Sequence, residues 1–221
     1  SMGTPLTFGL GVNANETLPS IVEKSLAAET LGLKYVWIGD SPVQLYGPVV
    51  ASVAAARTSR IRIGLGLMSV LLHTPIQIAD AMATLCRAYG DRFDLCIGVG
   101  DRQQLNQVGV YPEKINNLPH FVLKAKQEIA SHLHNARVRA KIWLGAQGPR
   151  MLGIAKNFDG VLLNYSNVKM IGWAIAEARL RGKRGFRIGI YSPSYVYVRR
   201  ERGVQRLAKV SSAVVAVGGT T

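Results

Sequence analysis

Short apolar runs and helix-forming segments alternate along almost the whole chain, and this rhythm limits the possible folds more than any other feature. The runs are continuously hydrophobic, as strands of a parallel sheet buried on both faces are. Strands that alternate with helical segments indicate βα units. The predicted strands are Thr7–Asn13, Tyr35–Gly39, Arg60–Leu67, Phe93–Val99, Lys141–Gly145, Gly160–Asn164 and Phe186–Val198.

Start and stop signals mark the helices between these strands. Pro19 stands in the first turn of a predicted helix that Gly32 ends, and Thr74 with Pro75 begins another that Gly90 ends. The other predicted helices are Pro48–Arg57, Phe121–Asn135, a short one from Pro149 to about Lys156, and one that Ser166 or Asn167 caps and that runs to Gly182.

Seven such units without a reversal of order predict an α/β fold, a (β/α)8 TIM barrel, in a single domain over residues 1–221. An eighth strand is either Ala213–Val217 or absent, so the barrel is expected to be incomplete. An open barrel has unpaired strand edges, which predicts a homo-oligomer, a dimer or a larger assembly.

The net charge of +14 arises in the second half of the chain. Residues 1–100 hold 7 basic and 7 acidic residues, whereas residues 101–221 hold 20 and 6. This asymmetry suggests an anionic partner, either nucleic acid or a polyanionic cofactor, or else a solvated basic face. Nucleic acid is the less favoured partner, because the chain has no recognisable nucleic-acid-binding motif.

Several classes of protein are excluded at this stage. No apolar run reaches the roughly 18 residues of a membrane helix. The first residues lack the features of a signal peptide, so a cytoplasmic location is expected. Cys86 and Cys96 form no disulfide framework, and neither the cysteines nor the histidines have metal-site spacing, so no metal is predicted.

Glycines gather where three predicted strands end. Each of these ends carries a G-x-G sequence, at Gly9–Gly11, Gly64–Gly66 and Gly98–Gly100. None has the third glycine of the dinucleotide fingerprint. Active sites of TIM barrels lie at the carboxyl ends of the strands. The glycines therefore indicate either a flat ligand that approaches closely or simple packing of the barrel.

Polar groups at the same ends have two interpretations each. Asp40 and Asp101 could bind a ligand or cap the turn that follows. The stretch Gly145–Pro149 fits a phosphate site or an ordinary βα turn, and Asn164 ends the next strand. No nucleophile elbow, P-loop or paired carboxylates are recognisable. These strand ends suit redox chemistry in which a bound cofactor reacts with a small-molecule substrate.

Five segments together resemble the bacterial-luciferase-like superfamily, and within it the methylenetetrahydromethanopterin reductase branch, archaeal enzymes that use coenzyme F420. They are Tyr35–Asp40, Thr58–Gly66, Phe93–Asp101, Gly145–Leu152 and Asp159–Asn164. The resemblance extends over nearly the whole chain. It implies an F420-dependent oxidoreductase that transfers a hydride between the deazaflavin and a small substrate such as methylenetetrahydromethanopterin, with FMN as the alternative cofactor.

The resemblance also implies positions for the cofactor site. Asp40 would hydrogen-bond the cofactor, and Gly66-Leu67 would be a non-prolyl cis peptide against its ring. A phosphate would be bound by a loop after the fifth strand. The remaining positions would border the ring or the phosphate. The implied set is Asp40, Gly66, Leu67, Met68, Ser69, Gly98, Gly100, Asp101, Ala146, Gln147, Gly148, Leu163 and Asn164.

Departures from the family pattern leave the catalytic residue unidentified. The strand-one glutamate of the reductases, their suspected proton donor, is replaced by Gly11, and the usual histidine after Asp40 by Ser41. The chain also ends early relative to the family. A degenerate, non-catalytic flavin- or F420-binding protein is therefore the alternative function, and a basic scaffold protein is a third possibility.

Overall fold

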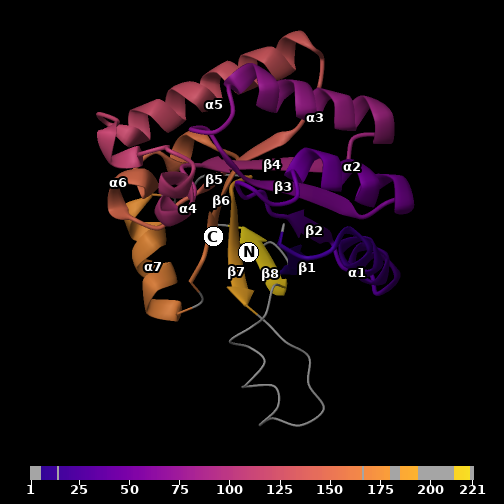
Figure 1. Ribbon diagram of the computed structural model, residues 1–221. Helices are drawn as coiled ribbons and strands as arrows, with labels where there is room; N and C mark the ends of the chain where they lie inside the picture. Colours follow the sequence, from indigo (N-terminus) through magenta and orange to yellow (C-terminus); the bar gives the residue numbers. More distant parts are fainter. Residues whose placement is uncertain (1–5, 14, 166, 180–184, 194–211, 220–221) are drawn as a thin grey trace.

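The computed structural model describes residues 6–13, 15–165, 167–179, 185–193 and 212–219. Eight strands form one closed barrel in sequence order, and the described helices lie around most of its outside (Figure 1). The predicted TIM-barrel fold is confirmed. The strands are β1 (Thr7–Val12), β2 (Tyr35–Ile38), β3 (Arg62–Ser69), β4 (Phe93–Gly98), β5 (Lys141–Gly145), β6 (Gly160–Leu163), β7 (Arg187–Pro193) and β8 (Ser212–Gly219).

Most helices occur where they were predicted, but α5 begins three residues earlier, at Leu118, and α6 ends at Leu152 instead of about Lys156. Thr74 and Gln77 form a capping box at the start of α3, and Asn167 caps α7. A short helix, α4, begins in the polar stretch after β4. The helices are α1 (Leu18–Thr30), α2 (Gly47–Arg57), α3 (Pro75–Tyr89), α4 (Arg102–Gln107), α5 (Leu118–Asn135), α6 (Pro149–Leu152) and α7 (Val168–Glu177).

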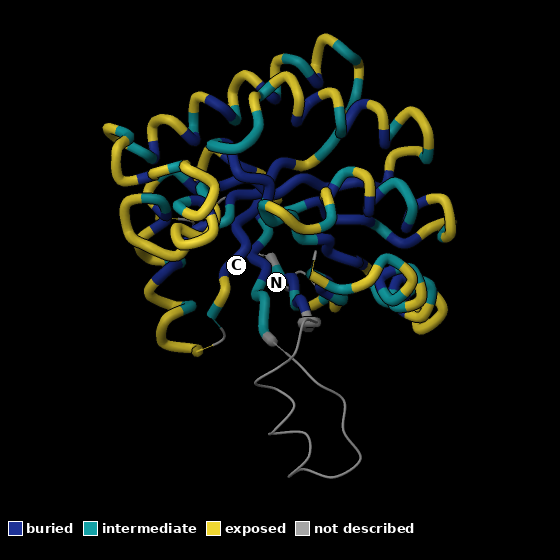
Figure 2. Tube along the Cα trace, viewed as in Figure 1, coloured by how far each residue is buried: buried dark blue, intermediate teal, exposed yellow. Residues whose placement is uncertain are grey.

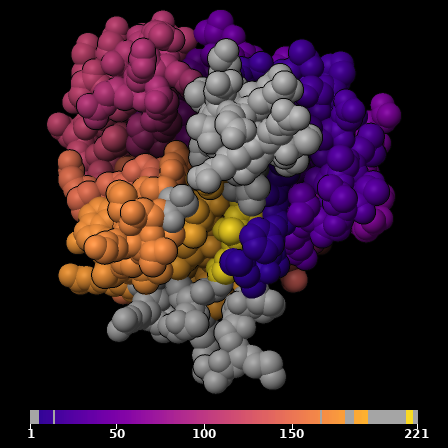
Figure 3. Space-filling view, turned by 90° about the horizontal axis from the view of Figure 1, so that it is seen from below, coloured from indigo at the N-terminus to yellow at the C-terminus, as the bar shows by residue number. Residues whose placement is uncertain are grey.

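The last strand closes the barrel in an unexpected direction. β8 runs antiparallel to both of its neighbours, pairing Val215 with Gly9 of β1 and Val217 with Gly189 of β7. Figure 3 shows β1 in indigo beside β8 in yellow. An antiparallel strand needs no crossover helix, so a short chain can still close the barrel. The expected open edge is therefore wrong, and with it the reason given for self-association.

Most strand limits agree with the prediction to within one residue, and those of β3 and β7 differ more. β3 begins two residues later than expected, because the N–H groups of Arg60 and Ile61 point to the Glu29 carboxylate instead of to a neighbouring strand. β7 ends at Pro193, and the rest of the predicted strand lies outside the described residues. The predicted helix to Gly182 ends at Glu177, and its last predicted residues also lie outside the described part.

Aromatic side chains fill the inside of the barrel. Trp37 and Trp143 are fully buried and meet edge to face, with ring centroids 5.4 Å apart. Glycines on neighbouring strands leave the room they need: Gly64 is paired with Trp37, and Gly160 with Trp143. A Cβ on either glycine would overlap the indole beside it. Gly64 therefore serves packing of the barrel, which is one of the two interpretations given for the G-x-G glycines, and Gly160 does the same on β6.

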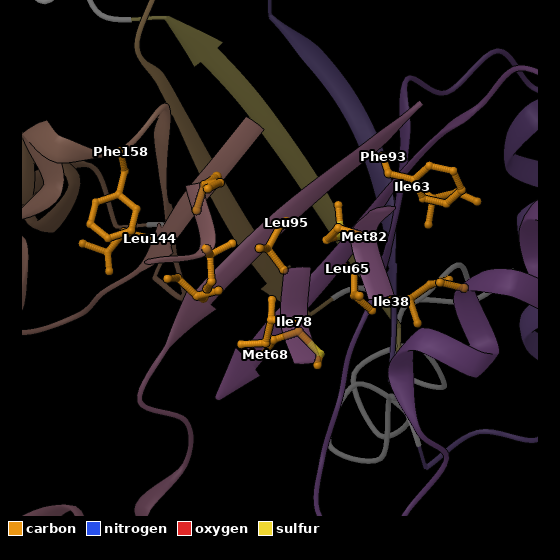
Figure 4. Packing of buried hydrophobic residues seen from close by; sticks show 14 of the residues in the cluster. Ile38, Ile63, Leu65, Met68, Ile78, Met82, Phe93, Leu95, Leu144 and Phe158 are labelled. Carbon is orange, nitrogen blue, oxygen red and sulfur yellow. The ribbon is translucent and has the colours of Figure 1, made fainter. Parts of the chain in front are cut away.

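A second, larger core, here called the outer core, lies between the strands and the helices. Figure 2 shows buried backbone along the strands and along the inward faces of the helices. Figure 4 shows part of this layer, with Met68 beside Ile78, and Ile63 beside Phe93. The strand side chains of this layer point away from the barrel interior, because successive residues of a strand alternate between its two faces.

Glu29, in the last turn of α1, fastens the loop before β3. Its carboxylate accepts hydrogen bonds from the N–H groups of Ser59, Arg60 and Ile61 at 2.9 to 3.0 Å. Burial raises the pKa of Glu29, but these hydrogen bonds outweigh it and lower the pKa to about 2. The carboxylate therefore stays ionised under most conditions and stabilises the fold in that form.

We expect Glu29→Gln to lower the free energy of unfolding at pH 7 by about 1 kcal/mol, since the charged acceptor is lost. A depressed pKa contributes stability above the unfolded pKa of 4.5, and the contribution disappears as the pH falls toward 2. The difference between wild type and variant should therefore shrink between pH 5 and about pH 2. Urea unfolding across this range measures it, with the exposed Glu23→Gln as control. A constant difference would contradict the role of the charge.

Candidate functional site

The carboxyl ends of β1 to β7 meet at one end of the barrel, here called the mouth. The peptide bond between Gly66 and Leu67 is cis, as the resemblance implies. The pairing of β3 with β4 shifts register between Leu65 and Met68, on either side of this bond. The side chain of Leu67 therefore points into the barrel, above Cys96.

Leu67, Gly98 and Gly145 form an apolar surface inside the mouth, here called the floor. A Cβ on Gly98 would lie 2.7 Å from Leu67 Cδ1 and 2.9 Å from the carbonyl oxygen of Gly145. A Cβ on Gly145 would overlap Leu67 as well. Only glycine fits at these two positions while Leu67 stays in place. The Leu67 side chain therefore lies over the two glycines, which add no side chains of their own to the floor.

Asp40 lies in the loop after β2 and has two partners. Its Oδ1 accepts a hydrogen bond of 2.7 Å from the N–H of Gly47, the first residue of α2. Its Oδ2 lies 3.5 Å from Nε2 of His73, and the His73 Nδ1 lies 2.9 Å from the carbonyl oxygen of Ser69. Asp40 therefore binds the first N–H of α2 and also joins the loops after β2 and β3.

The environment of Asp40 is only partly polar. Burial raises the pKa of Asp40, while the hydrogen bond from Gly47 and the nearby His73 lower it. The Tyr46 ring stacks on the imidazole, with centroids 5.8 Å apart. Sequence reasoning did not identify His73 or Tyr46 as part of the mouth. The available signal was the position of His73, six residues after the end of the predicted strand Arg60–Leu67.

Other predicted site residues near β3 and β4 make contacts with other parts of the protein. The Met68 side chain is buried in the outer core, away from the mouth. Ser69 Oγ donates a hydrogen bond to the carbonyl oxygen of Val99 and so joins the ends of the two strands. Gly100 has a φ of 98°, which favours glycine. Asp101 is exposed and caps α4, accepting from the N–H of Gln104 at 2.9 Å.

The loop after β5 lies beside the end of β6. Ala146 is buried, whereas Gln147 and Gly148 are exposed. Gln147 Oε1 accepts a hydrogen bond of 3.3 Å from the N–H of Asn164. No heavy atom outside its chain neighbours lies within 4 Å of a Cβ built on Gly148, so the space beside it is open. The side chain of Leu163 is fully buried in the outer core, and only its backbone reaches the mouth.

Tyr191 is a further residue of the mouth that sequence reasoning missed. Its ring occupies the space above Gly11, where a Cβ would lie 2.5 Å from Cε2 and Cζ. No larger side chain fits at Gly11 while Tyr191 keeps its place. The inward position of Tyr191 on β7 follows from the alternation of a strand, but its meeting with Gly11 depends on closure by β8.

Two expected absences concern only part of the chain. Among the described residues, no cluster of histidine, cysteine and acidic side chains could hold a metal ion. None of the helices in the described ranges is long and apolar enough to span a membrane. Cys86 and Cys96 are both unpaired thiols, and burial raises the pKa of Cys96 to about 12.

Comparisons with known proteins agree with this geometry. A family model described as luciferase-like monooxygenase matches residues 2–118. A 5,10-methylenetetrahydromethanopterin reductase of Archaeoglobus fulgidus is 29% identical over 163 residues, which cover 64% of this chain and 48% of that protein. An F420-dependent glucose-6-phosphate dehydrogenase of Kineococcus radiotolerans is 36% identical over 123 residues, 50% of this chain and 36% of that protein.

A solved structure is similar in fold. The coenzyme F420 dependent tetrahydromethanopterin reductase from Methanopyrus kandleri superposes with a TM-score of 0.81 at 21% identity, covering 91% of this chain and 70% of that one. The chain spans about half the length of the curated reductases that it matches.

Proposed function

Because this chain belongs to the luciferase-like monooxygenase family, we propose that it is an oxidoreductase that binds the deazaflavin coenzyme F420 at the mouth. The floor carries this proposal: Leu67, after the cis bond, lies against Gly98 and Gly145. Sites for such ring systems are lined mostly by apolar groups. The relatives named as F420-dependent support F420 over FMN, which is the alternative cofactor.

The residues around the floor fit such a ligand. Leu67 would contact one face of the ring, and Asp40 at one side of the mouth offers an acceptor. At the other side, the exposed Gln147, Gly148 and Asn164 surround open space that a phosphate would enter. The bound deazaflavin would supply a ring carbon that accepts or gives a hydride. The protein would hold the ring and orient the second substrate above it.

The second substrate in this proposal is a small molecule of the methylenetetrahydromethanopterin type. The names of several relatives support it. The direct test is hydride transfer from the reduced cofactor to this substrate, monitored by the absorbance of the cofactor. A reduced cofactor that binds but is never oxidised by it would contradict this choice of substrate.

A non-catalytic binding protein is the second candidate function. The place of the family's strand-one glutamate is taken here by Gly11 and the ring of Tyr191. If that carboxyl group is indispensable, the chain binds the cofactor without hydride transfer. A Gly11→Glu variant would clash with Tyr191, so its activity is informative only together with Tyr191→Ala.

We expect Gly148→Glu to weaken F420 binding at least tenfold, which corresponds to about 1.4 kcal/mol of binding free energy. The variant should not destabilise the fold. The new side chain enters open space and brings a negative charge to the proposed phosphate position. Fluorescence titration of the purified protein with F420, and separately with FMN, measures the affinity. The same titration identifies the cofactor.

Gly148→Ala is the matched control, since it adds a Cβ without charge and should bind as the wild type does. Equal weakening by alanine and glutamate would mean that the backbone of Gly148, and not charge, matters. Unchanged binding in Gly148→Glu would place the phosphate elsewhere. Failure of the wild type to bind either cofactor would overturn the proposed function.

A further inference from the structure

The helix α7 carries large apolar side chains on its outside. From Val168 to Glu177, only Ala174 is buried. Met170 is 45% exposed and Trp173 39%. Figure 1 shows α7 at the outer edge of the molecule, next to α6, and Figure 2 shows that little of it is buried. Apolar groups gathered in this way on the surface indicate that another molecule covers them.

Five exposed residues of α7 form one stripe, here called the α7 stripe. They are Lys169, Met170, Trp173, Ala176 and Glu177. Positions three and four apart are neighbours on the surface of a helix, so the stripe is continuous. Its spacing is the same in both directions from Trp173, which lies at the centre.

This spacing makes the stripe complementary to a second copy of itself that runs in the opposite direction. A twofold axis beside Trp173 would bring each Trp173 next to its counterpart and each Met170 opposite Ala176 of the second copy. Lys169 would lie opposite Glu177 of the second copy, and this pair would occur twice. Each Glu177 would also approach the N-terminal turn of the other helix, and each Lys169 its C-terminal turn, as the helix dipoles favour.

The charge of α7 suits a second copy better than an acidic partner. The helix carries one basic and one acidic residue, whereas residues 101–221 carry 20 and 6. Two chains with a net charge of +14 repel each other in general, so a neutral stripe is a favourable place for them to meet. Arg179, just after the helix, would lie opposite Asn167 of the second copy, which is uncharged.

We propose that two copies of this chain form a twofold symmetric dimer through their α7 stripes. Burial of Met170 and Trp173 drives the association, and the two Lys169–Glu177 pairs fix its direction. A twofold interface uses the same patch on both subunits, which is what this stripe offers. Two helices of ten residues make a small interface, so the dimer should dissociate with a Kd of about 10 to 100 µM.

The first test is sedimentation equilibrium of the full chain, measured over a range of concentrations that brackets this Kd. The ionic strength is kept at about 0.15 M, because salt also screens the repulsion between the two basic chains. Lys169→Glu and Glu177→Lys should each weaken the dimer at least about tenfold, since two attractive pairs become two pairs of like charge. A wild type that stays monomeric, or a dimer that ignores both reversals, would overturn the proposal.

The double variant Lys169→Glu with Glu177→Lys distinguishes the direction of the helices. It exchanges the two charges, so it should restore the wild-type Kd to within about threefold. In a parallel pair Lys169 would face Lys169, and the double variant would rescue nothing. Lys124→Glu and Glu128→Lys on α5 are the matched controls, because both residues are exposed and have the same type of charge. These controls should leave the dimer unchanged, and failure of the rescue would refute the antiparallel arrangement.

The second test follows Trp173 itself. The other two tryptophans, Trp37 and Trp143, are buried inside the barrel. Dilution through the Kd should therefore shift the tryptophan emission to longer wavelength as Trp173 becomes exposed to water, and Trp173→Phe should show no such shift. Dissociation in the centrifuge without a change in emission, or a shift that persists in Trp173→Phe, would place the interface elsewhere and refute the proposal.

Discussion

Gly64→Ala is expected to destabilise the protein by about 3 kcal/mol or more, at the upper end of the cost of overpacking. Gly64 lies beside Trp37 inside the barrel, and the added Cβ would overlap the six-membered part of the indole. Trp37 is 1% exposed and packs against Tyr35 and Trp143, so it has no free direction in which to move. The thermal midpoint should fall by roughly 10 °C, as expected for a domain of this size.

Two further variants separate this effect from the general cost of replacing a glycine. Gly172→Ala lies on an exposed part of α7 with nothing within 4 Å of the new Cβ, and it should stabilise the helix by up to about 1 kcal/mol. Trp37→Leu makes room beside residue 64, so it should cost less in the Gly64→Ala background than alone. Additive effects in this double-mutant cycle would show that the two side chains do not collide.

The strand-end glycines show how far sequence reasoning could go. The G-x-G sequences predicted either a flat ligand or packing, and the structure divides them between the two. Gly64 faces an indole, whereas Gly98 faces the side chain of Leu67 at the mouth. The difference depends on which side chain of the neighbouring strand lies opposite, and that is set by the register of the closed barrel. A single sequence carries no direct signal of this register.

The rhythm of strands and helices was predictable because it is local. Thr74 with Pro75 marks a helix start by its own hydrogen-bonding and backbone preferences, and the capping box is present. The direction of β8 was not predictable in this way. An apolar run such as Ala213–Val217 is compatible with either direction, and the choice depends on how the chain returns from β7. The predicted α/β rhythm therefore held, while the way the barrel closes had to come from the structure.

The site was predictable mainly as a set of strand ends. Asp40, Gly98 and the loop at Gln147 lie at the mouth, as their positions after predicted strands implied. His73 and Tyr191 were missed because each matters through a partner far away in sequence, Asp40 and Gly11 respectively. Such pairs form only when the barrel closes, so neither a motif nor a period in the sequence identifies them.

Arg92→Ala is expected to lower the free energy of unfolding by about 3 to 5 kcal/mol, because several buried carbonyl groups would lose a charged donor together. The Arg92 guanidinium donates to the carbonyl oxygens of Ala55 at 2.6 Å, Thr58 at 3.0 Å and Ile61 at 3.1 Å. Ala55 and Thr58 lie at the end of α2, where helix carbonyls have no partner within the helix. Only 9% of the residue is exposed, so water cannot replace the side chain fully.

The controls for Arg92 distinguish charge from geometry. Arg92→Lys keeps the charge but lacks the planar set of donors, so it should restore only part of the lost stability. Arg57→Ala removes a basic side chain from the same end of α2 where it is exposed, and it should change stability by less than about 0.5 kcal/mol. Urea unfolding of the three variants measures the differences. If Arg92→Lys were as stable as the wild type, a positive charge alone would suffice. The expected intermediate stability means instead that the guanidinium is needed because it reaches the end of α2 and the start of β3 at the same time.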